Sequence, residues 1–161
     1  MSGPIMSHDA LVARALRWLT NTKKCWVATG EPVAGTAGEQ PDAMGWRGMT
    51  SHLVECKTSR SDFHRDRRKF FRAYPDKGMG EFRWYLTPAG LLEPSDLPAH
   101  WGLLEARKRV IKVVVVAVRQ ESDLQRERML LAGQLRKGRT EAAHRLERWL
   151  ARTPLGQAVD P

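Results

Sequence analysis

The chain has 161 residues, of which 42% are hydrophobic, which allows one folded domain with its own core and excludes an intrinsically disordered protein. Its 27 Lys and Arg residues outnumber its 18 Asp and Glu residues, and the net charge of +9 favours a polyanionic partner such as nucleic acid. The two cysteines form no Cys-x-x-Cys pair, which excludes a cysteine zinc cluster and argues against a disulfide scaffold.

The first half of the chain predicts one helix, three strands and a second helix. Ser7 has the character of a helix N-cap, and the apolar residues from 11 to 19 repeat on one helical face. Strands are predicted at three places, 24–30, 42–48 and 51–58. A Gly/Pro-rich loop at 31–41 follows the first strand, and Ser59 caps a helix expected to reach about Ala73.

The second half predicts three more strands, at 81–87, 101–106 and 110–118, and then two helices. The helices are expected at 120–135 and 140–150, with a break at Gly138 in the segment RKGR. Their apolar residues would form the seam of a helical hairpin: Leu124, Met129, Leu130, Leu131, Leu135, Leu146, Trp149 and Leu150. The order of elements predicts an α/β fold, a mixed sheet with helices on its faces.

We therefore expect three parts: an α/β domain at 1–118, a C-terminal helical hairpin at 119–152 and a flexible tail at 153–161. The part from 119 to 152 holds nine Arg and Lys residues against five acids, so the hairpin suits either DNA contact or a homodimer. The N-terminus lacks the regions of a signal peptide, and the longest apolar run is too short to span a bilayer. A cytoplasmic protein without membrane contact is expected.

The strand in LVECKTSRSDF places a carboxylate and an ammonium on one face. Side chains alternate along a strand, so Glu55 and Lys57 share one face, while Val54 and Cys56 share the other and can pack under a helix. A hairpin can bring Asp42, thirteen positions earlier, beside Glu55. The alternative is an exposed Glu55–Lys57 ion pair, with Asp42 as an ordinary turn residue after Pro41.

Two neighbouring carboxylates repel each other unless a cation lies between them, and carboxylate and carbonyl oxygens are the ligands that Mg²⁺ prefers. A bound metal would polarise a phosphate oxygen and lower the pKa of a bound water. Lys57 would orient or deprotonate the attacking water, or neutralise charge that develops on the phosphate. In outline, this is a phosphodiester-hydrolysing site.

The layout PDAMGW…HLVECKTSRSDF resembles the PD-(D/E)XK nuclease superfamily. The segments TSRSDFHRDRRKFFR, GMGEFRWYLTPAGLLEPSDLP and WGLLEA are similar to a small phage and bacterial branch, akin to the MmcB-like DNA repair proteins. The resemblance covers about residues 25–106 and implies a restriction-endonuclease-like core. It does not extend to the last fifty or so residues.

The resemblance also implies roles for individual residues. Asp42, Glu55 and the backbone carbonyl of Cys56 would hold Mg²⁺ or Mn²⁺, and Asp42, Glu55 and Lys57 would form the catalytic set. Many family members add an acid from the first helix, which residues 11–20 lack, and this puts a second metal in doubt. Glu31, just after the first predicted strand, is a candidate substitute.

A basic segment follows the predicted site, with seven Lys and Arg residues against three acids between 55 and 75. We expect phosphate contacts from Ser59, Arg60, Ser61, Arg65, Arg68, Lys69 and Arg72. The alternatives are a solvated charged face and, for Ser59 with Asp62, a capping box. The aromatic face of the same helix is interpreted as core packing.

Together, these features predict a metal-dependent DNA endonuclease or repair-type nuclease. The main alternative is a non-catalytic nucleic-acid-binding module with a nuclease-like fold, since family members include domains that bind without cutting. An interaction protein that works through its C-terminal helices is a third possibility.

Overall fold

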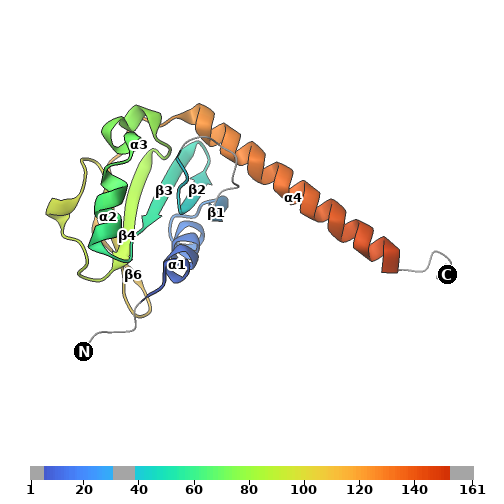
Figure 1. The fold of residues 1–161 in the computed structure, drawn as a ribbon, viewed down its shortest axis with the longest axis horizontal. Helices are drawn as coiled ribbons and strands as arrows, with labels where there is room; N and C mark the ends of the chain where they lie inside the picture. The colour runs from blue at the N-terminus through green and yellow to red at the C-terminus, as the bar shows by residue number, and fades with distance from the viewer. Residues whose placement is uncertain (1–5, 31–38, 153–161) are drawn as a thin grey trace.

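The structure, a computed structural model, describes residues 6–30 and 39–152. Six strands form one mixed sheet with helices on its faces, and a long helix extends from the domain (Figure 1). The predicted α/β fold, with flanking helices and a C-terminal helical extension, is therefore confirmed. Within the described ranges, no helix is long and apolar enough to cross a membrane.

The sheet has its strands in chain order, and they are β1 (Val27–Gly30), β2 (Ala43–Arg47), β3 (Thr50–Cys56), β4 (Phe82–Pro88), β5 (Gly102–Ala106) and β6 (Ile111–Val115). The helices are α1 (His8–Asn21), α2 (Arg60–Arg67), α3 (Phe70–Ala73) and α4 (Leu124–Arg152), with short 3-10 turns η1 (Pro75–Lys77) and η2 (Pro94–Asp96). Strands β3, β4 and β5 are mutually parallel, and the other pairs are antiparallel. The carboxyl ends of β3, β4 and β5 therefore lie at one edge of the sheet.

Helix α1 covers one face of the sheet. The Ser7 side chain accepts a hydrogen bond from the Ala10 amide, which confirms the predicted N-cap. Beneath α1 lie Val54 and Cys56, as the alternation of β3 predicted. Apolar burial of this kind supplies roughly 25 cal/mol per Å² removed from water, so the α1 face is a main source of stability.

The second face of the sheet packs against α2, the segment before β5 and the start of α4. Its core includes Leu53 from β3 and Phe63 from α2. Tyr85 stacks on Trp101 with ring centroids 4.4 Å apart. Since Glu55 and Lys57 point to the same face as Leu53, they lie beneath α2 and α3.

The single helix predicted from Ser59 to about Ala73 is wrong, because the chain breaks into α2 and α3. Arg68 ends α2, and Lys69 has extended backbone angles, with φ −64° and ψ 145°. In an unbroken helix, residue 72 would be rotated about 240° from residue 66. The break instead lets Arg72 return to the carboxylate of Asp66, 2.8 Å away.

The predicted helical hairpin is also wrong, because α4 is one helix of 29 residues. Gly138 lies among good helix formers, and its cost of about 1 kcal/mol relative to Ala does not end the helix. The predicted apolar contact between two C-terminal helices therefore does not form within the chain. Met129 is 55% and Leu135 is 71% exposed, while the side chains of Leu146, Trp149 and Leu150 and the predicted tail at 153–161 lie outside the described part.

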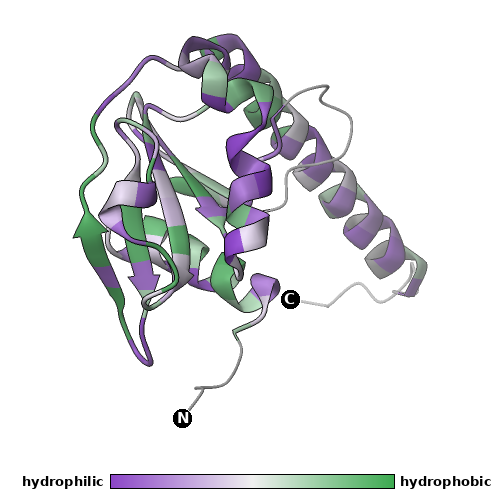
Figure 2. Cartoon of the chain, turned by 60° about the vertical axis from the view of Figure 1, so that its left-hand side comes forward, coloured by the Kyte–Doolittle hydropathy of each residue, from purple (hydrophilic) through white to green (hydrophobic). Residues whose placement is uncertain are grey.

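Within the described residues, α4 is anchored on the sheet domain at its start. The Glu127 carboxylate accepts hydrogen bonds from the Trp46 indole (3.1 Å), the Ser51 hydroxyl (3.0 Å) and the Gly80 amide (2.8 Å). Leu130 is buried one turn later. Beyond residue 134 the described side chains are exposed, and the helix surface is largely hydrophilic (Figure 2).

Candidate functional site

The end of strand β3 brings the predicted acid and lysine into contact. Lys57 Nζ donates a hydrogen bond to Glu55 Oε2 over 2.8 Å. The pair is not the exposed ion pair of the alternative interpretation, because Glu55 is 1% and Lys57 is 5% exposed. A buried ion pair must be held by further partners to offset its desolvation.

Asp42 joins this pair from the residue before β2. Its Oδ2 accepts a hydrogen bond of 2.7 Å from the Cys56 amide and lies 3.5 Å from Lys57 Nζ. Because the amide and carbonyl of one strand residue point to the same side, the Cys56 carbonyl also faces Asp42. From the start of α1, His8 Nε2 approaches the same Asp42 oxygen to 3.3 Å.

A third carboxylate, Asp66, comes from α2. Its Oδ1 lies 3.6 Å from Lys57 Nζ and 2.7 Å from Lys69 Nζ. Its Oδ2 accepts a hydrogen bond of 2.6 Å from the Tyr85 hydroxyl. Three segments that are distant in sequence thus supply carboxylates to one ammonium group.

Arg72, from α3, contacts the acids of this network and links them to one another. Its guanidinium forms a two-nitrogen contact with Asp66 and an ion pair with Glu39, and it lies over the Trp101 ring, 4.7 Å from the centroid. Arg72 Nη2 is 3.1 Å from Glu55 Oε1, yet this buried oxygen accepts no hydrogen bond from the described residues. This oxygen is therefore held by the charge of Arg72 and not by an aligned hydrogen bond.

The electrostatics of the network follow from its burial. Burial raises the pKa of Glu55 to about 7, although Lys57 and Arg72 act in the opposite direction. Burial alone would lower the pKa of Lys57, but Glu55, Asp66 and Asp42 outweigh it and raise that pKa. For Asp66, burial is outweighed by Arg72, Lys57 and Lys69, which lower its pKa.

The site offers oxygen atoms of the kind that bind divalent cations. Asp42, Glu55 and the Cys56 carbonyl offer the hard oxygen atoms that Mg²⁺ and Mn²⁺ take, and Glu55 Oε1 accepts no hydrogen bond from the described residues. The Lys57 ammonium occupies the space among the carboxylates of Asp42, Glu55 and Asp66. Within the described residues, no three His, Cys, Asp or Glu side chains are arranged to hold a metal ion. Metal entry would therefore require Lys57 to move. Glu31 lies outside the described residues.

The residues predicted to contact phosphates have different surroundings. Arg72 is not on the surface, since its side chain is only 2% exposed, so a direct phosphate contact from it is wrong. Arg60 forms a two-nitrogen ion pair with Asp96, and Lys69 pairs with Asp66. Arg65 and Arg68 are exposed and make no ion pair within the described residues.

The two serines at the start of α2 support local structure. The Ser59 hydroxyl accepts a hydrogen bond of 3.2 Å from the Asp62 amide, which makes Ser59 the N-cap of the helix. Ser61 lies beside it, with the two hydroxyl oxygens 3.0 Å apart. Capping therefore accounts for Ser59, and Ser61 stays a predicted phosphate contact.

Sequence reasoning missed Asp66, Glu39 and the inward position of Arg72. For Asp66 a signal existed, because it follows the buried Phe63 by three positions and so shares its inward helical face. For Glu39 no local pattern indicates burial. The position of Arg72 depends on the break at Lys69, which no glycine or proline marks.

Comparison with known proteins adds support for the fold. No protein-family model matches the chain, and no curated protein matches it. One solved structure, a protein of unknown function from Silicibacter pomeroyi, is similar over 99% of this chain and 100% of its own, with a TM-score of 0.62 and 25% identity. The likeness thus includes both the sheet and the C-terminal helix.

Proposed function

We propose that this protein is a metal-dependent DNA nuclease, similar to the PD-(D/E)XK nucleases, which hydrolyses phosphodiester bonds in the cytoplasm of a bacterial or phage-infected cell. One observation carries the proposal: Asp42, Glu55 and Asp66 converge from three segments on the Lys57 ammonium. Carboxylates gathered in this way require a cation, and in a nuclease a divalent cation would share that task.

Each side chain of the site then has a role. A divalent cation held by Asp42, Glu55 and the Cys56 carbonyl would supply charge that polarises a phosphate oxygen. Lys57 stays protonated because of its raised pKa, so it donates hydrogen bonds to the phosphate and offsets the charge that develops there. Arg72 and Asp66 act as positioning residues, because Arg72 forms an ion pair with Glu55 and Asp66 forms one with Lys57.

The test is cleavage of labelled linear, nicked, single-stranded and branched DNA with Mg²⁺ or Mn²⁺, and with EDTA. We expect metal-dependent cutting that falls by about 10²-fold or more in Lys57→Ala and Asp42→Asn. Lys77→Ala, which removes an exposed lysine, is the matched control and should cut like wild type. If the Lys57 and Asp42 variants cut as fast as the control, the site assignment is wrong.

A second function is favoured by the burial of Glu55. This residue is 1% exposed, and each of its oxygens lies within about 3 Å of a cationic side chain, an arrangement that also suits a purely structural network. The protein would then be a nucleic-acid-binding module without catalysis. Salt-dependent DNA binding, with no cutting of any substrate in the panel, would identify this function.

Self-association through α4 stays a prediction, supported by the exposed Met129 and Leu135 on that helix. We expect Leu135→Glu to lower the sedimentation coefficient if α4 joins two copies. Gln134→Glu, a neighbouring change on the same helix, is the control for the added charge. A wild-type chain that sediments as a monomer at high concentration would contradict the dimer.

A further inference from the structure

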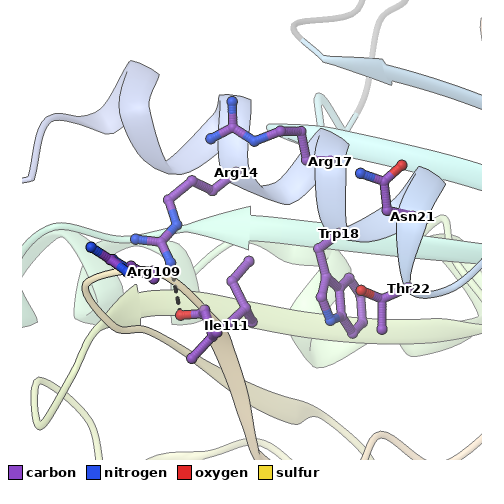
Figure 3. Close-up of a pocket in the computed structure, with 8 residues that line it drawn as sticks. Arg14, Arg17, Trp18, Asn21, Thr22, Arg109 and Ile111 are labelled. Atoms are coloured by element: carbon purple, nitrogen blue, oxygen red, sulfur yellow. Dashed lines mark hydrogen bonds between the residues drawn. The ribbon is translucent and has the colours of Figure 1, made fainter.

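A pocket of about 400 Å³ lies between α1 and the turn that joins β5 to β6 (Figure 3). Helix α1 contributes Arg14, Arg17, Trp18 and Asn21, Thr22 caps the end of the helix, and the turn contributes Arg109. Trp18 is buried and forms part of the apolar wall, while the guanidinium groups of Arg14 and Arg109 lie on the side of Ile111. The pocket therefore combines a fixed wall with three cationic groups.

The charge in this pocket is not compensated. No Asp or Glu lines it, and in the described part of the chain neither Arg17 nor Arg109 forms an ion pair. Arg14 donates a hydrogen bond of 2.7 Å to the Val110 carbonyl, which ties the helix to the turn. Burial and the nearby Arg17 both lower the pKa of Arg14, a sign that the two guanidinium groups repel each other. An anion would relieve this repulsion.

The β5–β6 turn and the candidate site both lie at the carboxyl ends of the parallel strands, but on opposite faces of the sheet. The pocket is on the face that α1 covers, whereas Glu55 and Lys57 point to the other face. The turn follows the carboxyl end of β5, and Lys57 follows the carboxyl end of β3, which lies two strands or about 10 Å away. Helix α1 also joins them, because His8 approaches Asp42 and Arg17 lies nine residues, or about 14 Å, further along.

We propose that this arginine pocket binds a backbone phosphate of nucleic acid. Guanidinium groups match phosphate oxygens with paired N–H donors, and the Asn21 amide and Thr22 hydroxyl add uncharged donors. The identity of the polyanion rests on the proposed function, whereas the recognition of phosphate rests on the pocket itself. The contact would fix the position of the strand without reading its sequence.

The test is equilibrium binding of fluorescent duplex DNA in EDTA, at several salt concentrations, by the double variant Arg17→Gln/Arg109→Gln. Both side chains are exposed and unpaired within the described residues, so the fold should persist. We expect affinity to fall about tenfold and the slope of log K against log salt to shrink by about one. The control is Arg47→Gln, an exposed arginine at the opposite end of β2, which should bind like wild type.

Equal affinity and salt slope in the double variant and the control would overturn the pocket assignment. Loss of inorganic phosphate binding in the double variant without any change in DNA binding would also overturn it, since the pocket would then serve a small anion. Cleavage with Mg²⁺, measured in parallel, keeps the two proposals apart. Absent cleavage with a pocket-dependent salt slope would count against the nuclease alone.

Discussion

Two basic regions flank the carboxyl edge of the sheet, and they differ in how their charges are used. In the segment from α2 to α3, Arg60, Lys69 and Arg72 are each paired with a carboxylate. In the pocket of α1 and the β5–β6 turn, Arg17 and Arg109 have no such partner within the described residues. Part of the denser run of basic residues is thus neutralised internally, while its Arg65 and Arg68 stay exposed and unpaired within the described residues. Charge counted along a sequence predicts a polyanion-binding surface only after the internal ion pairs are removed.

The comparison implies that the ion-paired residues of the segment from α2 to α3 stabilise the fold. The largest expected effect, on the free energy of unfolding, tests this. We expect Arg72→Ala to lower the free energy of unfolding by about 3–5 kcal/mol, because it leaves Glu39, Glu55 and Asp66 buried without their shared cation. Arg17→Ala, from the unpaired region, should change it by about 0.5 kcal/mol or less. Urea denaturation measures both, and similar changes would contradict the distinction.

The pH dependence of cleavage sharpens the same comparison. Burial raises the pKa of Glu55 to about 7, and only the ionised carboxylate can hold a cation. The ionised fraction of the metal-free site grows as the pH rises through 7, so kcat/KM at a sub-saturating Mg²⁺ concentration should increase by up to about tenfold per pH unit below 7 and level off above it. Guanidinium groups do not titrate here, so the contribution of the arginine pocket to DNA binding should stay constant. A flat kcat/KM profile between pH 5.5 and 8 would count against Glu55 as a ligand.

The smallest expected effect is on DNA affinity, and it distinguishes Arg60, at the start of α2, from Arg68, just after its end. Arg68 is exposed and unpaired in the described ranges, whereas the charge of Arg60 is offset by Asp96. We expect Arg68→Gln to weaken DNA binding about threefold and Arg60→Gln to weaken it less. Fluorescence anisotropy at low salt resolves such differences. A larger loss of DNA affinity from Arg60→Gln than from Arg68→Gln would show that the ion pair with Asp96 does not reduce the contribution of Arg60 to DNA binding.

Much of the fold follows from local sequence signals. The alternation of β3 placed Val54 and Cys56 under α1 and put Glu55 beside Lys57, and Ser7 marked the start of a helix; all of this is confirmed. The errors arose where tertiary contacts decide. The break at Lys69 serves the return of Arg72 to Asp66, and α4 continues through Gly138 because one glycine does not end a helix of strong formers.

The candidate site could be predicted only in part. Asp42, Glu55 and Lys57 are brought together as expected, since strand pairing fixes their positions. Their burial was not predicted, because it depends on Arg72 and Glu39, which come from remote segments. The sequence did not predict the arginine pocket, although the segment ARKRVIK around Arg109 is as rich in basic residues as the segment 55–75, which was predicted to contact phosphates. Its second half comes from α1, and no local pattern joins the two.

The anchoring of α4 by Glu127 and Leu130 has a mechanical consequence. The helix is attached over its first two turns and then continues for about 30 Å without a described contact, at ~1.5 Å per residue. It therefore acts as a lever, for which a tilt of about 10° at the anchor moves the far end by roughly 5 Å. Small adjustments around Trp46, Ser51 and Gly80 would thus be amplified into large displacements of the basic residues near its end.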